Sequence, residues 1–539
     1  MSTLLHRNAL RAAALTPAAA LIAAALPSGA ASADTAPPQG TPATVSADPL
    51  PTWQVDGVVW SMTTVGNTVY AVGNFTRARP PGAAPGSSSE VPRRNILAFD
   101  ITTGNLIKSF NHSLNGQGLR VVASPDRSRI YVGGEFTAVN GKPRHRLAAF
   151  DTKSGKLVEG FQPRISNVVR AIAATNDAVY FGGNFFAVNG SSRTRLAAVR
   201  ARDGSSINTW KPTVDDEVHA MVMSPSGKRV IIGGRFQKLN GKSRVGIGAV
   251  RATDGATATW TSDPIPARSG GNFSYTTDLY VADGVLYGSA NGQGRKWFDG
   301  RYAADPENGD LIWLDNCYGA TYGVYATGKV LYSVNHAHDC SSLGAFPESP
   351  SRRALATTTY AVGRDPAPPS ANSKYRNQPV PGLLHWFPAL GTGSFTGQYQ
   401  AAWTITGNGK YIALGGEFPT ANGTKQQGLT RYAIRSLAPN KIRPQAASTL
   451  TPTVTRRLDG KVTVRWKATW DQDNHQLTYE VLRGTQVVHT RKVGSNFWTL
   501  PNQTYVDAAP PGTHVYRIRV TDPLGNRLTS GESQQIRIR

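Results

Sequence analysis

The residues best suited to chemistry are clustered in one short segment, 335–340, which contains His336, His338 and Asp339. Imidazole can move protons near neutral pH and can bind metals. On a strand, side chains two residues apart point the same way. The sequence offers no distant third ligand, so a structural or polar role is favoured over a metal site, and no metal or cofactor is expected.

Three charged residues elsewhere suggest acid–base or uronic-acid chemistry: Glu135, Glu417 and Arg170. The sequence does not fix their separation, so no mechanism follows. It contains no nucleophile elbow, phosphate-binding glycine loop or zinc motif. The motifs therefore favour a binding site over a catalytic one, although the enzyme class stays open.

A sequence repeat must position these residues. Its unit is an apolar run, then G-G-x-F, three further residues and Asn-Gly, a pair that tolerates the positive φ of a tight turn. Strong copies are IYVGGEFTAVNG from Ile130, VYFGGNFFAVNG from Val179, VIIGGRFQKLNG from Val230 and IALGGEFPTANG from Ile412. Weaker copies start at Val69, Leu286 and Leu331. The chain thus carries seven units.

Each unit reads as four short strands, which predicts an all-β, seven-bladed β-propeller over residues 50–438. The last unit lacks its fourth strand. We expect the segment around Trp53 to replace it by pairing with residues 429–435, which would close the ring. The repeats resemble the delta-60-repeat propellers of secreted bacterial proteins, a resemblance that implies an architecture and no catalytic motif.

Loops on one face of such a propeller are the expected binding surface. Polar residues end the second strand of every unit on this face, and other polar or aromatic residues begin the first strand there. The candidate ligand-binding residues are Trp60, Glu135, Arg170, His219, Arg235, Tyr322, His336, His338 and Glu417. The alternative is that the polar residues cap the backbone of the neighbouring blade.

Residues 446–539 differ in character and resemble a fibronectin type III β-sandwich, with Trp466 in its core and Tyr516 as a tyrosine corner. Such modules act as spacers or adaptors. Asp471, Asp473 and Asn474 are interpreted as a solvated turn, because one short loop supplies too few oxygens for calcium.

The N-terminus predicts export. Residues 1–33 have the basic start, apolar stretch and small-residue cleavage site of a signal peptide, and no later stretch is long and apolar enough for a transmembrane segment. Residues 34–49 are interpreted as a disordered leader because they are rich in Pro, Ala and Thr. In an exported chain the two cysteines, Cys317 and Cys340, are expected to form a disulfide.

The formal net charge of +24 favours acidic partners through long-range attraction. Nucleic acid is not expected outside the cell. The favoured function is a secreted, extracellular, monomeric binding protein that recognises a polysaccharide, another acidic envelope polymer or a protein. The rival is a carbohydrate-active enzyme, a lyase or hydrolase, at the channel mouth; a purely structural protein is the third alternative. A concave pocket that gathers His336, His338 and acidic partners would favour the enzyme.

Overall fold

The computed structural model of the chain describes residues 40–265, 274–292, 298–366 and 375–539. These residues form β-strands and two short 3-10 turns, Ser341–Leu343 and Ser448–Leu450, without any α-helix. The described part has no helix with the length and apolarity that a membrane span requires. The predicted signal peptide and the first six residues of the predicted leader lie outside the described residues.

Seven antiparallel sheets follow one another between residues 58 and 433. In chain order they are β2 (Val58–Val65), β3 (Thr68–Asn74) and β6 (Ile96–Asp100); β7 (Gly118–Ala123), β8 (Arg129–Gly134) and β11 (Leu147–Asp151); β12 (Val169–Ala174), β13 (Ala178–Gly183) and β16 (Leu196–Arg200); β17 (Val218–Met223), β18 (Arg229–Gly234) and β21 (Ile247–Arg251); β22 (Tyr275–Ala282), β23 (Val285–Asn291), β24 (Arg301–Ala304) and β25 (Leu311–Asp315); β26 (Thr321–Thr327), β27 (Val330–Ala337), β28 (Arg352–Arg364) and β29 (Pro379–Leu383); β30 (Ala402–Gly407), β31 (Tyr411–Gly416) and β34 (Leu429–Ala433).

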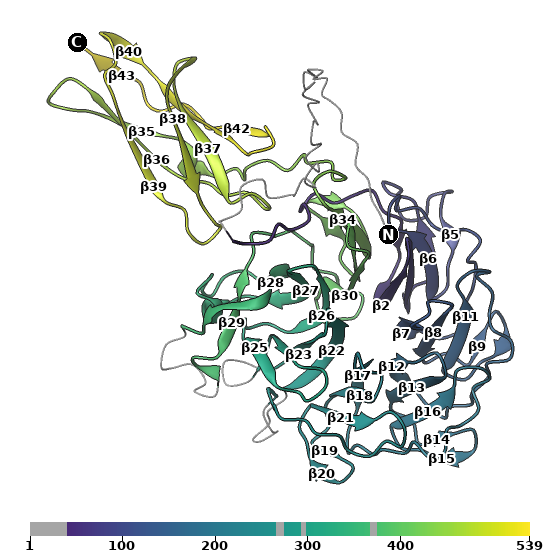
Figure 1. Cartoon of the computed structure of the whole chain (residues 1–539). Coiled ribbons are helices and arrows are strands. Elements are labelled where there is room, and N and C mark those ends of the chain that lie inside the picture. Colours follow the sequence, from purple (N-terminus) through teal and green to yellow (C-terminus); the bar gives the residue numbers. More distant parts are fainter. Residues whose placement is uncertain (1–39, 266–273, 293–297, 367–374) are drawn as a thin grey trace, which may run out of the picture.

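The first strands of successive sheets contact one another, and β30 of the last sheet contacts β2 of the first. The sheets therefore form a closed ring with their first strands on the inside, which is the topology of a β-propeller (Figure 1). Apolar side chains fill the space between neighbouring sheets. Tyr180 and Trp210, for example, pack with Met221 and Ile232 of the next sheet.

The outermost strand is reduced to a single bridge in the first four sheets, such as Phe99 with Leu106, where four full strands were predicted. An aromatic residue that follows the bridge, such as Phe110 or Trp210, is buried in the core and holds this segment in place.

Short two-stranded ladders project beyond the sheets. Four of them contain the predicted Asn-Gly turns, in which both residues have positive φ, as at Asn140 and Gly141. The ladders are β9 (Ala138–Val139) with β10 (Lys142–Pro143), β14 (Ala187–Val188) with β15 (Ser191–Ser192), β19 (Lys238–Leu239) with β20 (Lys242–Ser243), and β32 (Thr420–Ala421) with β33 (Thr424–Lys425). A further small sheet joins β1 (Gln54–Val55), β4 (Arg77–Arg79) and β5 (Val91–Pro92).

The N-terminal segment does lie against β34, but with residues other than those predicted. The amides of Ser46 and Leu50 donate to the carbonyls of Ala433 and Arg431, each at 2.9 Å. Trp53 instead donates its amide to Gly104 of the first sheet at 3.0 Å. The segment crosses from the last sheet to the first, so it ties together the two ends of the ring.

The prediction of a disordered leader is wrong for its last part. Thr44, Val45, Ser46 and Ala47 are buried. The amide of Val45 donates to the hydroxyl of Tyr332 at 2.8 Å. Polar partners on the propeller therefore satisfy the backbone of a segment whose composition alone suggested disorder.

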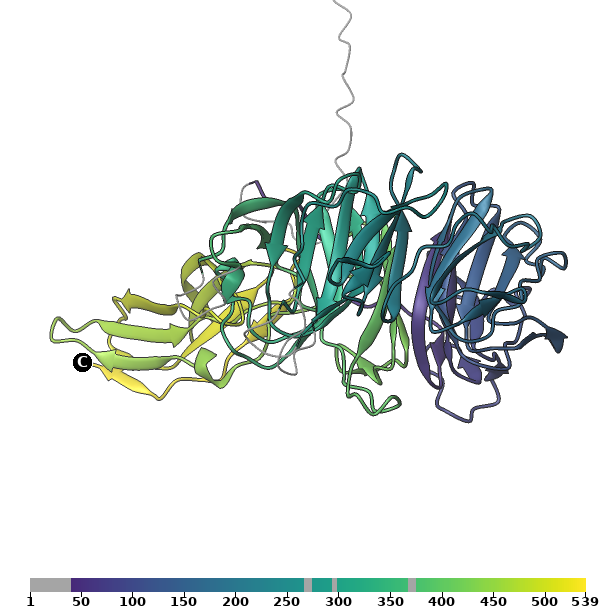
Figure 2. The ribbon, with the colours of Figure 1, turned by 90° about the horizontal axis from the view of Figure 1, so that it is seen from below.

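The C-terminal residues form two packed sheets, which extend from one side of the propeller (Figure 2). Trp466 and Tyr516 lie in the core between them, and the Tyr516 hydroxyl donates to Asp507 at 2.7 Å. The sheets are β35 (Thr453–Arg456), β36 (Val462–Lys467) and β39 (Asn502–Asp507), and β38 (Gln486–Gly494), β37 (Gln476–Arg483), β41 (Tyr516–Thr521) and β42 (Arg527–Thr529), with a ladder of β40 (Gly512–His514) and β43 (Ile536–Ile538).

An aromatic cluster joins the C-terminal sheets to the propeller. Phe387 of the propeller and Phe497 lie with ring centroids 5.2 Å apart, and the Arg352 guanidinium lies 3.6 Å from the Phe497 ring centroid. The amide of Phe387 also donates to the Gln472 carbonyl at 2.9 Å. The C-terminal unit therefore packs directly on the propeller.

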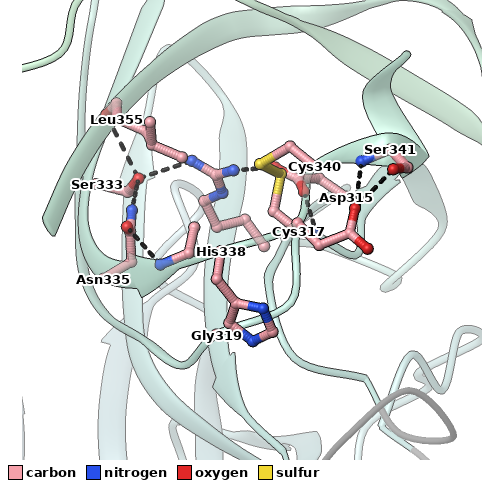
Figure 3. Close-up of a disulfide and its surroundings, with 12 residues drawn as sticks. Asp315, Cys317, Gly319, Ser333, Asn335, His338, Cys340, Ser341 and Leu355 are labelled. Atoms are coloured by element: carbon pink, nitrogen blue, oxygen red, sulfur yellow. Dashed lines mark hydrogen bonds and ion pairs between the residues drawn. A yellow bond between two sulfur atoms is a disulfide. The ribbon is translucent and has the colours of Figure 1, made fainter. Parts of the chain in front are cut away.

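The predicted disulfide is confirmed. Cys317 and Cys340 are bonded, with Cα atoms 4.2 Å apart. Both residues are buried where the fifth and sixth sheets meet, beside Asp315, which accepts a hydrogen bond from the Cys317 amide at 2.8 Å (Figure 3). The bond therefore links neighbouring sheets of the ring.

Candidate functional site

A β-bulge interrupts the first strand of each of the seven sheets. In each case one residue of the strand has no partner opposite it, as Arg170 has none between Val169 and Ala171. A bulge re-aims the side chain of its extra residue. The seven bulge residues are Trp60, Leu119, Arg170, His219, Thr277, Tyr322 and Trp403.

The second glycine of the repeat accommodates this bulge. A side chain on Gly183 would collide with the carbonyl oxygen of Val168, and one on Gly234 would collide with that of Glu217. Both carbonyls belong to the residue just before the paired start of a first strand. Gly73, Gly134 and Gly416 are crowded in the same way, so the close approach of two backbones explains the second glycine in five of the seven sheets.

All seven bulge residues line one cavity of about 370 Å³ at the mouth of the central channel. They are joined there by residues of the same strands and of adjoining segments. These further lining residues are Gln117, Arg120, Tyr275, Asp278, Asn291, Gln398 and Thr404. The cavity thus receives at least one side chain from every sheet of the ring.

One side of the cavity is aromatic. Its three rings come from consecutive sheets across the junction of the ring: Tyr322 and Trp403 have centroids 4.3 Å apart, and Trp403 and Trp60 5.1 Å apart. The Trp60 indole donates to Gln117 at 2.9 Å, and the Trp403 indole donates to Glu417 at 3.2 Å. We call Tyr322, Trp403 and Trp60 the aromatic arc.

The third and fourth sheets place charge on the cavity. His219 lies 3.5 Å from Glu217. The neighbouring His219 side chain and the positive charges of Arg170 and Arg235 lower the pKa of the Glu217 carboxyl to about 2. Burial lowers the pKa of His219. The Arg235 guanidinium lies 4.6 Å from the centroid of the Tyr275 ring.

An ion pair spans the channel between the second and fifth sheets. Arg120 Nη1 lies 2.7 Å from Asp278 Oδ1. Each residue directly follows a bulge residue of its strand, and both are partly buried. Arg120 therefore compensates the charge of Asp278. Arg170 also lines the cavity, and it forms no ion pair with any described residue.

The polar residues at the ends of the second strands form a layer behind the cavity. Glu417 is buried and accepts hydrogen bonds from the amide and hydroxyl of Thr396, at 2.8 and 2.7 Å. His336 contacts the Tyr322 hydroxyl at 3.3 Å, and burial lowers its pKa to about 4. Glu417 thus braces the loop that precedes its own sheet, and His336 braces the aromatic arc through Tyr322.

The structure thus brings four of the nine predicted site residues to the cavity wall: Trp60, Arg170, His219 and Tyr322. Arg235, His336 and Glu417 contact wall residues from behind. Glu135 does not line the cavity. His338 follows the end of β27 and pairs with Glu348 at 2.8 Å, so it does not share a site with His336. Within the described ranges, no group of three or more His, Cys, Asp or Glu residues is placed to hold a metal.

The sequence contained a signal for the wall residues that were missed. Leu119, Thr277 and Trp403 occupy the same place in their units as Arg170 and His219, one residue before an alternating apolar run. Aligning all seven first strands, rather than only the clearest ones, would have found them.

The chain matches no protein-family model and no curated protein. Among solved structures, a chain of the mitotic checkpoint complex is 10% identical over 73% of this chain and 98% of its own length, with a TM-score of 0.42. The Pan2 WD40 domain of Neurospora crassa is 11% identical over 59% of this chain and 90% of its own, with a TM-score of 0.30. The assignment of a propeller rests on the strand topology of the chain itself.

Proposed function

We propose that this chain is a secreted, non-catalytic binding protein that recognises an acidic polysaccharide or a related anionic polymer outside the cell. In this proposal the seven sheets are the seven blades of a delta-60-repeat-like propeller. The C-terminal sheets are a fibronectin type III-like module that is docked on it.

The ring of bulge residues carries the proposal. It places the aromatic arc on one side of the cavity and Arg170, with Arg235 behind it, on another. Aromatic faces stack on the apolar faces of sugar rings, and a guanidinium binds carboxylate or sulfate through charge-assisted hydrogen bonds. Arg170 lines the cavity, so an anionic group of a ligand bound there would meet its guanidinium.

The cavity is concave, which was the feature expected of the rival enzyme. The acid–base groups that the enzyme hypothesis invoked are not gathered there, because His338 and Glu135 lie elsewhere and Glu417 is committed to Thr396 and Trp403. Asp278, the carboxylate of the cavity wall, is paired with Arg120. Glu217, beside His219, has a lowered pKa, whereas a general acid needs a raised one. Binding without turnover is therefore the better-supported function.

We expect Arg170→Glu to weaken binding of an acidic polysaccharide by about tenfold at low salt, because a charge-assisted hydrogen bond is lost and repulsion replaces it. Binding of polygalacturonate, hyaluronate and neutral dextran to the purified chain would be measured by calorimetry at several salt concentrations. The matched control is Arg364→Glu, which makes the same charge reversal at an exposed arginine at the end of β28, outside the cavity.

Equal weakening in both variants would mean that the attraction is diffuse and that the cavity is not the site. Preference for dextran would contradict the acidic ligand. New reducing ends or unsaturated products in the same incubations would favour the enzyme.

A further inference from the structure

The turn between β36 and β37 buries two carboxylates and an amide. Asp471, Asp473 and Asn474 are at most 1% exposed, so the prediction of a solvated turn is wrong. The turn faces the propeller, where His385 hydrogen-bonds the Asp471 carbonyl at 2.8 Å. It also faces the N-terminal segment, where Ser46 donates its hydroxyl to Asp473 at 2.8 Å.

The carboxyl groups of this turn have no cationic partner among the described residues. Neither Asp471 nor Asp473 forms an ion pair with any residue that the structure describes. Asp522, in the turn after β41, is also buried; burial of Asp471 and the proximity of Asp522 raise the pKa of the Asp471 carboxyl. A fully buried carboxyl group without a cationic side chain beside it is either protonated or bound to a metal cation, because an uncompensated buried charge is costly.

Two oxygens in the turn also lack hydrogen-bond partners. Asp471 Oδ2 and Asn474 Oδ1 are buried, and within the described part of the chain neither accepts a hydrogen bond. A buried oxygen without a donor is unusual in a folded protein. A cation would satisfy both atoms, because it interacts with acceptors and needs no proton.

The spacing of the side chains suits such an ion. Asn474 Nδ2 lies 2.7 Å from Asp473 Oδ1 and 3.3 Å from Asp471 Oδ1. An amide's nitrogen and oxygen are assigned by their partners and exchange on rotation. Rotation of Asn474 would place its oxygen 2.7 Å from Asp473 Oδ1 and 3.3 Å from Asp471 Oδ1. Separations of this size are edges of a shell with calcium–oxygen bonds of about 2.3–2.6 Å.

We propose that Asp471, Asp473 and Asn474 bind a calcium ion through their side-chain oxygens. Calcium accepts carboxylate and amide oxygens together and tolerates irregular shells, whereas magnesium requires a near-octahedral shell. Main-chain carbonyls or water would complete the coordination. The proposal is independent of the cavity at the channel mouth and does not rest on the proposed function.

Binding would also stabilise the junction between the two parts of the chain. Asp473 Oδ2 accepts hydrogen bonds from the Ser46 hydroxyl and, at 2.7 Å, from the Ala47 amide. An ion held by the same carboxylate would therefore fix the turn that contacts both the N-terminal segment and the propeller.

The test is calcium titration of the purified full chain after treatment with chelator. We expect calorimetry to show one site. We also expect the melting temperature to rise by about 5 °C when calcium exceeds its dissociation constant about a hundredfold, and to rise less with magnesium. A wild-type chain that gives no heat and no change in melting temperature would overturn the proposal.

Two variants separate binding from a merely structural role. Asp471→Asn keeps an acceptor oxygen for the amides of Asp473 and Asn474 but removes one charge, so it should melt no lower than wild type in chelator and should lose the calcium response. Asn474→Asp adds a carboxylate, so it should melt lower in chelator and respond more strongly to calcium.

The matched control is Asp459→Asn, which makes the same charge change at a partly exposed aspartate in the turn before β36 and should respond like wild type. An undiminished response in Asp471→Asn would contradict the site. So would a weaker response in Asn474→Asp, even if the other variant failed to fold.

Discussion

Replacing Arg431 by alanine should lower the free energy of unfolding by about 3 to 5 kcal/mol. Arg431 lies on β34 and is 1% exposed. Its guanidinium donates to the carbonyls of Pro51 and Ile101, at 2.7 and 2.5 Å, and to the Thr52 hydroxyl at 3.2 Å. One side chain thus joins the last sheet, the N-terminal segment and the first sheet.

The size of the effect follows from what would be left behind. Burial lowers the pKa of Arg431 to about 10, so the guanidinium is still charged at neutral pH. Its removal takes the donor from two buried acceptors, the Ile101 carbonyl and the Thr52 hydroxyl, and each costs about 1 to 3 kcal/mol.

Urea unfolding followed by tryptophan fluorescence provides the measurement for this variant. Lys425→Ala, at an exposed position of β33 in the same region, should change stability by less than about 0.5 kcal/mol. If Arg431→Ala cost no more than that control, closure of the ring would not depend on this side chain.

The parts of the fold that the sequence predicted are those in which one local requirement recurs from unit to unit. The second glycine recurs because two backbones approach closely at five of the seven bulges. Asn-Gly recurs because four ladder turns require positive φ at both residues. Such requirements depend on residues close in the sequence, so one amino-acid sequence is enough to predict them. The disulfide was predictable for a different reason, because Cys317 and Cys340 are the whole cysteine content of the chain.

The errors arose where a distant partner decides the structure. Residues 44–47 have the composition of a disordered leader, but Tyr332 and Asp473 supply the hydrogen bonds that order them. The turn at Asp471 is polar, so its sequence predicts a solvated turn, but in the structure the propeller covers it. His336 and His338 were grouped by strand alternation, which stops applying because β27 ends at Ala337.

The candidate site was predicted in part. Trp60, Arg170, His219 and Tyr322 were found because strand order places them at one face. The aromatic arc was not foreseen, because its three rings come from β26, β30 and β2, which meet only when the ring closes. A property of the closed ring, rather than of any repeat, therefore determines which side of the cavity is aromatic.

We expect Trp403→Ala to weaken binding of an acidic polysaccharide by about thirtyfold, or about 2 kcal/mol. Trp403 is the central ring of the arc, with Tyr322 on one side and Trp60 on the other. Its removal would take away a stacking surface and loosen both neighbours. Because stacking does not depend on charge, the loss should be the same at low and high salt, in contrast to the loss in Arg170→Glu.

Phe186→Ala is the matched control, since Phe186 is an aromatic residue that is 65% exposed and does not line the cavity. It should bind like wild type. The variants would be compared by calorimetry with polygalacturonate at two salt concentrations, after thermal unfolding has shown that each is folded. A folded Trp403→Ala protein with unchanged affinity would move the site away from the channel mouth. A loss that disappeared at high salt would show that the arc acts by positioning charge rather than by stacking on the sugar.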